Sequence, residues 1–145
     1  PYLIPDDSLL TALKMAAMSG VDVRVMIPGR ADHKLVYWAS QSYIGELLKS
    51  GVRCFRYDKG FLHAKMMVVD GEIASVGSAN LDIRSFKINF ETNAFLFDTD
   101  LATHLEQIFR QDLAVCTEVT LEAYEQRPVV VRLKESLTRL LSPIL

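Results

Sequence analysis

The sequence has few of the features that would indicate a nucleic-acid-binding or a membrane-spanning protein. It holds 16 lysines and arginines against 18 acidic residues, which gives a formal net charge of −2, and it contains no dense basic run. Nucleic-acid binders usually present a basic face, so this balance argues against a nuclease without excluding one. No apolar run approaches the roughly 20 residues that span a bilayer, and no signal peptide is present. We therefore expect that the chain does not insert into a membrane by itself and is soluble.

Cysteine is also scarce. Cys54 and Cys116 lie in apolar stretches without the spacing of a metal site or a redox pair, so we expect two buried, reduced thiols. The chain begins with Pro1 rather than Met, and we expect it to be a fragment or a processed product. Its 145 residues are 50% apolar and 23% charged, which is typical of one globular domain with room for a core.

The first half of the chain alternates between helical and strand patterns. Asp6 and the polar residues after it predict a helix cap, and the helix ends near Gly20. Alternating valines then predict a strand over residues 21–27, followed by a helix over residues 34–50 and a strand over residues 52–57. This order predicts helices that cross between strands of one sheet.

The second half opens with a strand over residues 63–69, which Asp70 and Gly71 join to a strand over residues 72–77 as a hairpin. We expect a loop over residues 81–87, a strand over residues 88–97 and a long helix over residues 98–115. Two shorter helical segments follow. The whole predicts a single α/β domain over residues 1–145, with a mixed β-sheet flanked by helices and a helical segment over about residues 120–145.

The residues best suited to chemistry are His63, Lys65, Ser78 and Asn80. On a strand, His63 and Lys65 would lie on one face because side chains alternate. An imidazole can attack phosphorus or donate a proton to a leaving alkoxide. A neighbouring ammonium can neutralise the phosphate oxygens, and Ser78 and Asn80 can donate hydrogen bonds without adding charge. This set predicts attack on a phosphodiester without a metal ion or any other cofactor.

The pattern H-x-K-x4-D-x6-G-S-x-N, which begins at His63, resembles the signature of the phospholipase D superfamily. Beyond it, residues 1–7, 20–24, 32–37, 80–86 and 133–143 resemble bacterial cardiolipin synthases. The resemblance covers nearly the whole chain but only the second half of such an enzyme. It implies a phospholipase D-like domain whose full-length form carries an equivalent first half and membrane-spanning helices.

The resemblance also implies a reaction and partners. One histidine forms a phosphoryl-enzyme intermediate while another protonates the departing alcohol, and phosphatidylglycerol donates its phosphatidyl group to a second phosphatidylglycerol. The partners implied are the phospholipid, the membrane surface and the N-terminal phospholipase D-like half, or a second copy of the chain in its place. No nucleic acid is expected as a partner, and the full-length enzyme is expected at the bacterial cell membrane. A lipid hydrolase, a nuclease and an inactive half-enzyme remain alternatives.

Two acidic residues are interpreted differently. Glu91 stands where similar enzymes carry a carboxylate that orients the catalytic imidazole, and a solvated strand carboxylate is the alternative. Asp70 lies seven residues after His63, an odd separation that would direct it away from the catalytic face. We interpret Asp70 as a structural member of the motif, at the first position of the turn.

The sequence gives weaker indications of a functional role for three other residues. His33 lies in a polar stretch that matches the family, and Arg84 could bind a lipid phosphate or pair locally with Asp82. Both are candidates for substrate binding. His104 is expected to be solvated on its helix, and the three histidines offer no metal-ligand spacing, so no metal site is predicted.

The last segment combines an apolar stripe with three cations. Such a stripe can lie on an anionic membrane surface, but docking on the domain or on a partner domain is commoner and is the interpretation we favour. The apolar residues are Val130, Leu133, Leu137, Leu140 and Leu141, and the cations are Arg132, Lys134 and Arg139.

Overall fold

The structure is a computed structural model that describes residues 1–30 and 32–140. The helices are α1 (Asp7–Met18), α2 (Lys34–Lys49), α3 (Ile83–Lys87), α4 (Thr99–Leu113), α5 (Leu121–Glu125) and α6 (Val129–Arg139). The strands are β1 (Leu3–Ile4), β2 (Arg24–Pro28), β3 (Arg53–Tyr57), β4 (Met66–Val69), β5 (Ile73–Gly77), β6 (Leu81–Asp82), β7 (Asn93–Leu96) and β8 (Cys116–Val119).

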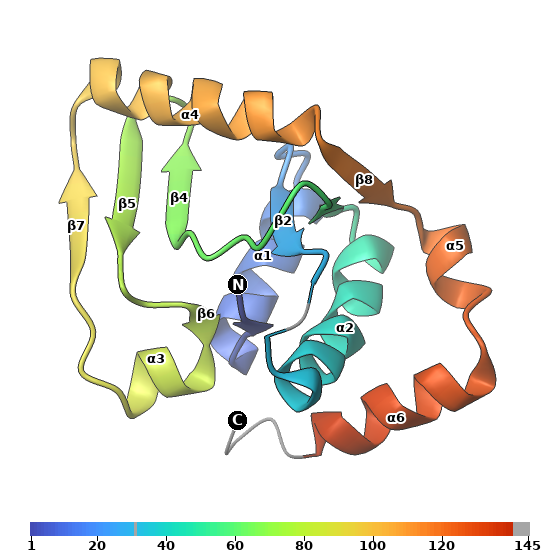
Figure 1. Ribbon diagram of the computed structural model, residues 1–145. Coiled ribbons are helices and arrows are strands. Elements are labelled where there is room, and N and C mark those ends of the chain that lie inside the picture. Colours follow the sequence, from blue (N-terminus) through green and yellow to red (C-terminus); the bar gives the residue numbers. More distant parts are fainter. Residues whose placement is uncertain (31, 141–145) are drawn as a thin grey trace.

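The strands form three sheets. β3 is central in a mixed sheet, parallel to β2 and antiparallel to β8. β5 is central in an antiparallel sheet between β4 and β7, and the short strands β1 and β6 pair in parallel. Figure 1 shows the two larger sheets side by side, with α4 crossing their upper ends. The expected α/β class with mixed strand directions and flanking helices is confirmed.

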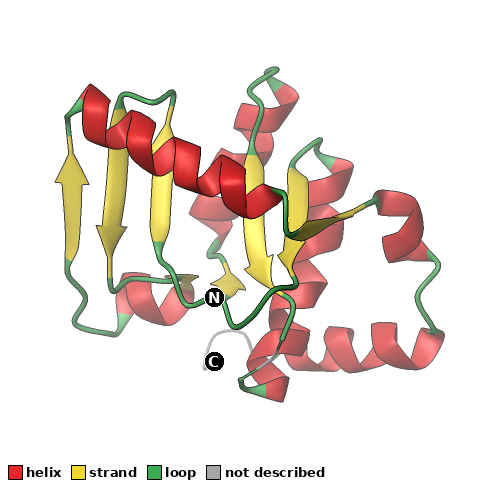
Figure 2. Ribbon diagram, turned by 45° about the horizontal axis from the view of Figure 1, so that its top comes forward, coloured by secondary structure: helices red, strands yellow, loops and turns green. Residues whose placement is uncertain are grey.

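The hydrophobic core lies between β2, β3 and the two long N-terminal helices. Figure 2 shows α4 in front of the strands, and α1 and α2 behind them. Ile44 and Leu47 of α2 are fully buried, as is Cys54 of β3. These side chains belong to a cluster of buried apolar residues from α1, α2, β1, β2 and β3, whose removal from water stabilises the domain. Both cysteines are free thiols, as expected, but Cys116 is only half-buried.

The strand expected over residues 21–27 begins only at Arg24. The amide of Val21 donates to the carbonyl of Ala16 (3.1 Å), and the amide of Gly20 donates to that of Ala17 (3.0 Å). This pair of bonds is a Schellman motif, and it needs the left-handed conformation of Gly20, whose φ is +93°. Val21 therefore belongs to the helix end, although its spacing matches the strand.

Three other predictions around the motif need correction. The strand expected over residues 63–69 starts at Met66, and the one expected over residues 88–97 is reduced to β7. The expected loop over residues 81–87 contains β6 and α3, because Asp82 caps a short helix by accepting from the Ser85 amide (2.6 Å). Strand β8 was not predicted. The helix after Asp98 and the hairpin at Asp70 and Gly71 are confirmed.

Helix α6 presents its apolar stripe to solvent. We expected the stripe to dock on the domain or on a partner domain. Docking on the domain is wrong for the described residues, and docking on a partner domain stays a prediction. Leu141, the last member of the predicted stripe, lies outside the described residues. The exposed fractions of the others are Val130 63%, Leu133 59%, Leu137 56% and Leu140 77%.

Candidate active site

The three segments that carry the motif converge at one end of the antiparallel sheet. Met66, the first residue of β4, pairs with Val76 near the end of β5, and Gly77 pairs with Asn93, the first residue of β7. The loop before β4, the turn after β5 and the loop before β7 therefore meet. The hairpin topology thus places His63, Ser78 and Glu91 at one edge, although 28 residues separate the first from the last.

His63 and Lys65 lie in the extended loop before β4. The ammonium of Lys65 lies 3.1 Å from Nδ1 and 3.5 Å from Nε2 of His63, and it donates to the His63 carbonyl at 3.1 Å. The ring of Phe61 packs beside the imidazole, with centroids 5.6 Å apart. The imidazole and the ammonium lie close together, as expected. Their proximity results from the conformation of the loop and not from a shared strand face, because β4 starts at Met66. His63 is exposed to solvent and can be reached by a substrate.

Lys65 is half-buried in the wall of a cavity of about 260 Å³ between β2 and β4. Burial lowers the pKa of its ammonium, and the carboxylates of Glu91, Asp82 and Asp32 act in the opposite direction. A half-buried ammonium interacts with an anion more strongly than an exposed one does, because water screens it less. The site can therefore stabilise a negative charge next to the imidazole.

Ser78 and Glu91 form the second part of the site. The Ser78 hydroxyl donates to Oε2 of Glu91 and accepts from the Thr92 amide at 3.0 Å. Oε1 of Glu91 accepts from the hydroxyl of Ser85 (3.1 Å) and from the side-chain amide of Asn89 (3.2 Å). This network fixes the turn after β5 against the loop before β7.

Among the described residues, the carboxylate of Glu91 is hydrogen-bonded to Ser78, Ser85 and Asn89 rather than to the imidazole of His63. Hydrogen bonds from Ser78, Asn89 and Ser85 lower the pKa of Glu91, and the charge of Lys65 adds to this effect. Glu91 thus stays ionised near Lys65 while its oxygens are bonded to neutral donors. In this structure it positions Ser78, whereas the sequence led us to expect a direct bond to the imidazole.

Asn80 lies at the inner end of the same turn. Its backbone amide donates to the hydroxyl of Ser85 (3.1 Å), and its side-chain oxygen Oδ1 is buried without a hydrogen-bond partner among the described residues. Asn80 lines the cavity together with Lys65. A buried polar atom without a partner is unusual in a folded domain and is often found at functional sites.

The structure adds two residues that the sequence did not indicate as part of the site. Ser85 bridges Glu91 and the backbone of Asn80. Asn93 accepts from the Ala79 amide (3.1 Å) and donates to Ser75 (3.0 Å), which holds the turn after β5. The sequence did contain a pattern that could have indicated Ser85. Asp82 can cap a helix by accepting from the amide three residues later, which is that of Ser85, but residues 81–87 were interpreted as a loop.

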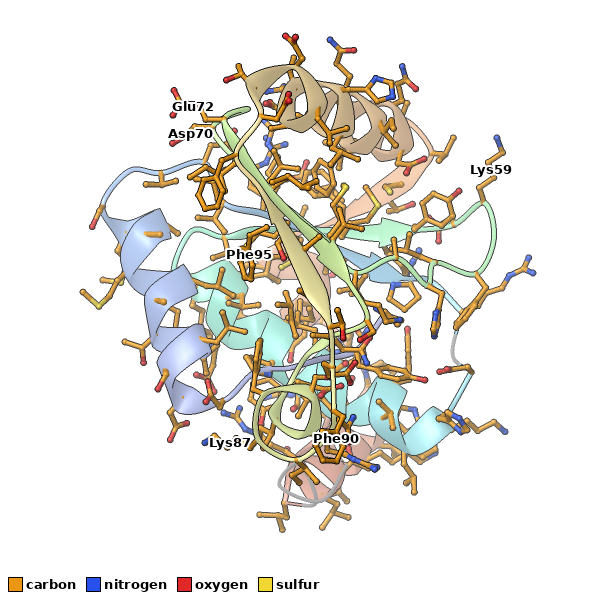
Figure 3. The ribbon with its side chains drawn as sticks, turned by 90° about the vertical axis from the view of Figure 1, so that its left-hand side faces the viewer. Lys59, Asp70, Glu72, Lys87, Phe90 and Phe95 are labelled. Atoms are coloured by element: carbon orange, nitrogen blue, oxygen red, sulfur yellow. The ribbon has the colours of Figure 1, made fainter. Side chains whose placement is uncertain are left out.

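Asp70 lies at the opposite end of the hairpin from His63. Figure 3 shows Asp70 beside Glu72 at the turn near α4, far from Phe90 at the other end of the sheet. Asp70 has a left-handed backbone, with φ at +53°, and the amide of Glu72 donates to the carbonyl of Val69 across the turn at 3.0 Å. This position agrees with a structural role, which remains a prediction.

Asp70→Asn is expected to retain full activity and stability, because asparagine tolerates the left-handed conformation as well as aspartate does. Asp70→Val should destabilise the fold by about 1–2 kcal/mol, since a β-branched residue is strained at positive φ. Urea unfolding together with lipid turnover measures both effects. A stable Asp70→Asn protein without activity would show that Asp70 has a chemical role.

The remaining candidates lie outside this network. His33 is the exposed residue before α2, and its amide donates to Asp32 (2.6 Å). Arg84 is exposed on α3, and the local ion pair with Asp82 is absent from the salt bridges between described residues. His104 is exposed on α4, as expected. His33 and Arg84 thus stay predictions as substrate contacts.

The described part of the chain lacks two features, a metal-binding cluster and a membrane-spanning helix. Over residues 1–30 and 32–140, no three His, Cys, Asp or Glu side chains are grouped so that they could hold a metal ion. In the same residues, no helix has the length and apolar character needed to cross a bilayer.

An α/β domain that holds an H-x-K loop against a Gly-Ser-x-Asn turn is a phospholipase D-like domain. Comparison with solved structures supports the fold. The phospholipase D family member Nuc from Salmonella typhimurium superimposes with a TM-score of 0.68, covering 82% of this chain and 78% of Nuc at 22% identity. At that identity the likeness establishes the fold alone.

Sequence comparison specifies the family. Residues 1–113 match the family described as cardiolipin synthase, PLD-like domain. The whole chain is 58% identical to the major cardiolipin synthase ClsA of Bacillus subtilis and 52% identical to the cardiolipin synthase of Oceanobacillus iheyensis. The chain belongs to the cardiolipin synthase family of phospholipase D-like domains. It spans about 30% of the length of these two relatives.

Proposed function

We propose that this chain supplies one half of the active site of a cardiolipin synthase. In the reaction, one phosphatidylglycerol transfers its phosphatidyl group to a hydroxyl of a second phosphatidylglycerol, and glycerol is released. The observation that carries the proposal is the contact between the Lys65 ammonium and the His63 imidazole at the exposed edge of the sheet. The 58% identity to a cardiolipin synthase over the whole chain supports the lipid substrate.

The chemistry proposed for the site has two steps. An imidazole nitrogen attacks phosphorus while a second histidine protonates the departing glycerol oxygen, which gives a phosphohistidine. The second histidine then takes the proton from the incoming hydroxyl, which attacks phosphorus and releases the imidazole. We assign one of these histidine roles to His63. Lys65 and Asn80 would bind the non-bridging oxygens as negative charge increases, and Ser78 would be held in place by Glu91.

The second histidine has to come from outside this site, because the chain has one H-x-K pattern. We propose that residues 1–145 form one phospholipase D-like domain and that an equivalent half faces it across a pseudo-two-fold axis. A second copy of the chain could take that place, with two His63 side chains facing each other. His33 and Arg84, both exposed, are proposed as contacts for the lipid headgroup. We place the full-length enzyme at the bacterial cell membrane.

The direct test is an assay of the proposed full-length enzyme, in which this domain is joined to an equivalent half; we call it the longer protein. Its three substrates are phosphatidylglycerol, a generic phosphodiester and single-stranded DNA. Turnover of phosphatidylglycerol to cardiolipin is expected, with slower or no reaction of the other two. Cleavage of DNA or of the generic diester alone would identify another phospholipase D-type phosphodiesterase. The isolated chain, assayed in parallel, is expected to be inactive wherever light scattering finds it monomeric.

Chelators are expected to leave turnover by the longer protein within about twofold of its starting value, because Lys65 supplies the positive charge that a metal ion would otherwise provide. The measurement is lipid turnover after dialysis against EDTA, with a mock-dialysed sample as control. A loss of activity that one divalent ion restores would contradict this assignment of Lys65.

A further inference from the structure

Helix α6 is attached to the domain through its polar side. Glu135 and Thr138 are buried, with 3% and 6% of their surfaces exposed. The carboxylate of Glu135 accepts from Arg127 at 2.6 Å, and the guanidinium of Arg139 lies 4.6 Å from the centre of the Tyr43 ring and pairs with Glu46. These contacts fix the rotation of the helix about its axis, so the opposite side must face outward.

The outward side is apolar along the whole helix. Val130, Leu133, Leu137 and Leu140 follow one another at intervals of three or four residues, so they share one face. Each is more than half exposed, and Val129 at the start of the helix is 76% exposed. A surface helix of a globular domain normally has the reverse orientation, with its apolar stripe inside. A continuous exposed apolar face of this kind indicates a binding surface.

The charges on this helix favour an anionic partner. Of the three cations in residues 129–139, Arg139 is on the inner side and is paired with Glu46, which leaves Arg132 and Lys134 for an outside partner. The anion in these residues, Glu135, is on the inner side and is paired with Arg127. Arg132 and Lys134 lie at the two borders of the apolar face, and both are exposed, although the ammonium of Lys134 also lies 5.4 Å from the centre of the Trp38 ring. Cations along both borders of an apolar face are typical of helices that lie in the plane of an anionic bilayer.

The outer face of α6 lies at the same end of the molecule as α3. Figure 1 shows α6 at the lower end of the molecule, the end at which β5 leads into β6 and α3. In Figure 3, Phe90 lies at the same end. Its side chain is fully exposed, and Ile88 two residues earlier is 61% exposed. The outer face of α6 and the exposed side chains of Ile88 and Phe90 therefore both lie at the end of the molecule that carries α3.

We propose that the outer face of α6 binds an anionic lipid surface and thereby holds the catalytic edge at the bilayer. This inference rests on the proposed lipid substrate for its purpose, but the binding itself is independent of turnover. The apolar side chains would enter the boundary between headgroups and acyl chains, and Arg132 and Lys134 would contact lipid phosphates. The polar inner side would keep its contacts with α2.

Binding of the 145-residue chain to vesicles tests the proposal. The chain should sediment with phosphatidylglycerol vesicles and at least tenfold more weakly with phosphatidylcholine vesicles. Leu133→Ser with Leu137→Ser should reduce binding to the anionic vesicles at least tenfold. Met18→Ser is the matched control, because Met18 is 75% exposed on α1, and it should leave binding unchanged. Unfolding curves should be the same for all three proteins.

Three outcomes would overturn the proposal. The first is equal binding to both vesicle types, and the second is full binding by the double serine variant. The third is a chain that does not bind vesicles but forms dimers, if the two serine substitutions abolish dimerisation. The outer face of α6 would then be a protein interface. The longer protein with His63→Asn separates membrane binding by α6 from catalysis at the His63 site, because it should bind vesicles normally while turning over no lipid.

Discussion

Replacing His63 by asparagine in the longer protein is expected to lower lipid turnover by about a thousandfold or more. Asparagine keeps a polar side chain of similar reach, but it can neither form a phosphoryl intermediate nor transfer a proton at neutral pH. Because His63 is exposed and its side-chain hydrogen bonding among the described residues is limited to Lys65, the free energy of unfolding should change by less than about 0.5 kcal/mol.

His104→Asn is the matched control for this substitution. His104 is also exposed, but it lies on α4, across the sheet from the site. Turnover and thermal unfolding of the two variants should be measured side by side. If both retain full turnover, His63 has no chemical role and the assignment of the site is wrong.

Replacing Lys65 by methionine is expected to lower kcat by about 100- to 1,000-fold, the usual loss when one group that stabilises transition-state charge is removed. Methionine has a similar length and suits a half-buried position, so the fold should persist. Lys65→Arg should recover part of the activity, because it keeps the charge but presents it as a planar fork.

Lys59→Met controls for the loss of one positive charge. Lys59 belongs to the loop between β3 and the motif, and Figure 3 shows its side chain extending away from the molecule. This variant should have normal kcat and normal KM. Should Lys65→Met raise KM without lowering kcat, the ammonium would bind the ground state and transition state equally, and its proposed role would be wrong.

The sequence predicts the elements whose signals are local. Asp6 and Asp98 cap α1 and α4 as expected, each accepting from the amide three residues later at 2.9 Å. The hairpin turn at Asp70 and Gly71 is also encoded within a few residues. Such interactions depend on neighbours in the chain, so the patterns that favour them can be recognised without knowledge of the fold.

The errors arise where distant segments decide the structure. Leu81 is in a strand because it pairs with Leu3, and Ser78 binds Glu91 through the pairing of Gly77 with Asn93. Neither pairing can be deduced from spacing along the chain. His63 and Lys65 were correctly placed together, but from an assumed strand. Their contact depends on the Lys65 side chain folding back over the loop to reach the His63 ring.

The orientation of helix α6 was also predicted wrongly, and the cause is again an interaction between distant segments. The apolar stripe alone favoured docking on the domain or on a partner domain, because burial of leucine is normally the stronger effect. The polar contacts to Tyr43 and Glu46 of α2, about 93 residues earlier in the sequence, reverse the orientation. Periodicity identified the two faces of this helix, but it could not determine which of them faces the protein.

The most direct test of the central claim is the product balance with phosphatidylglycerol that is labelled in its terminal glycerol. If the His63 site performs phosphatidyl transfer, the longer protein should release one labelled glycerol for each cardiolipin formed, and the His63→Asn protein should form neither. Phosphatidic acid as the sole lipid product, with glycerol but no cardiolipin, would show that the site passes the phosphatidyl group to water and would contradict the proposed function.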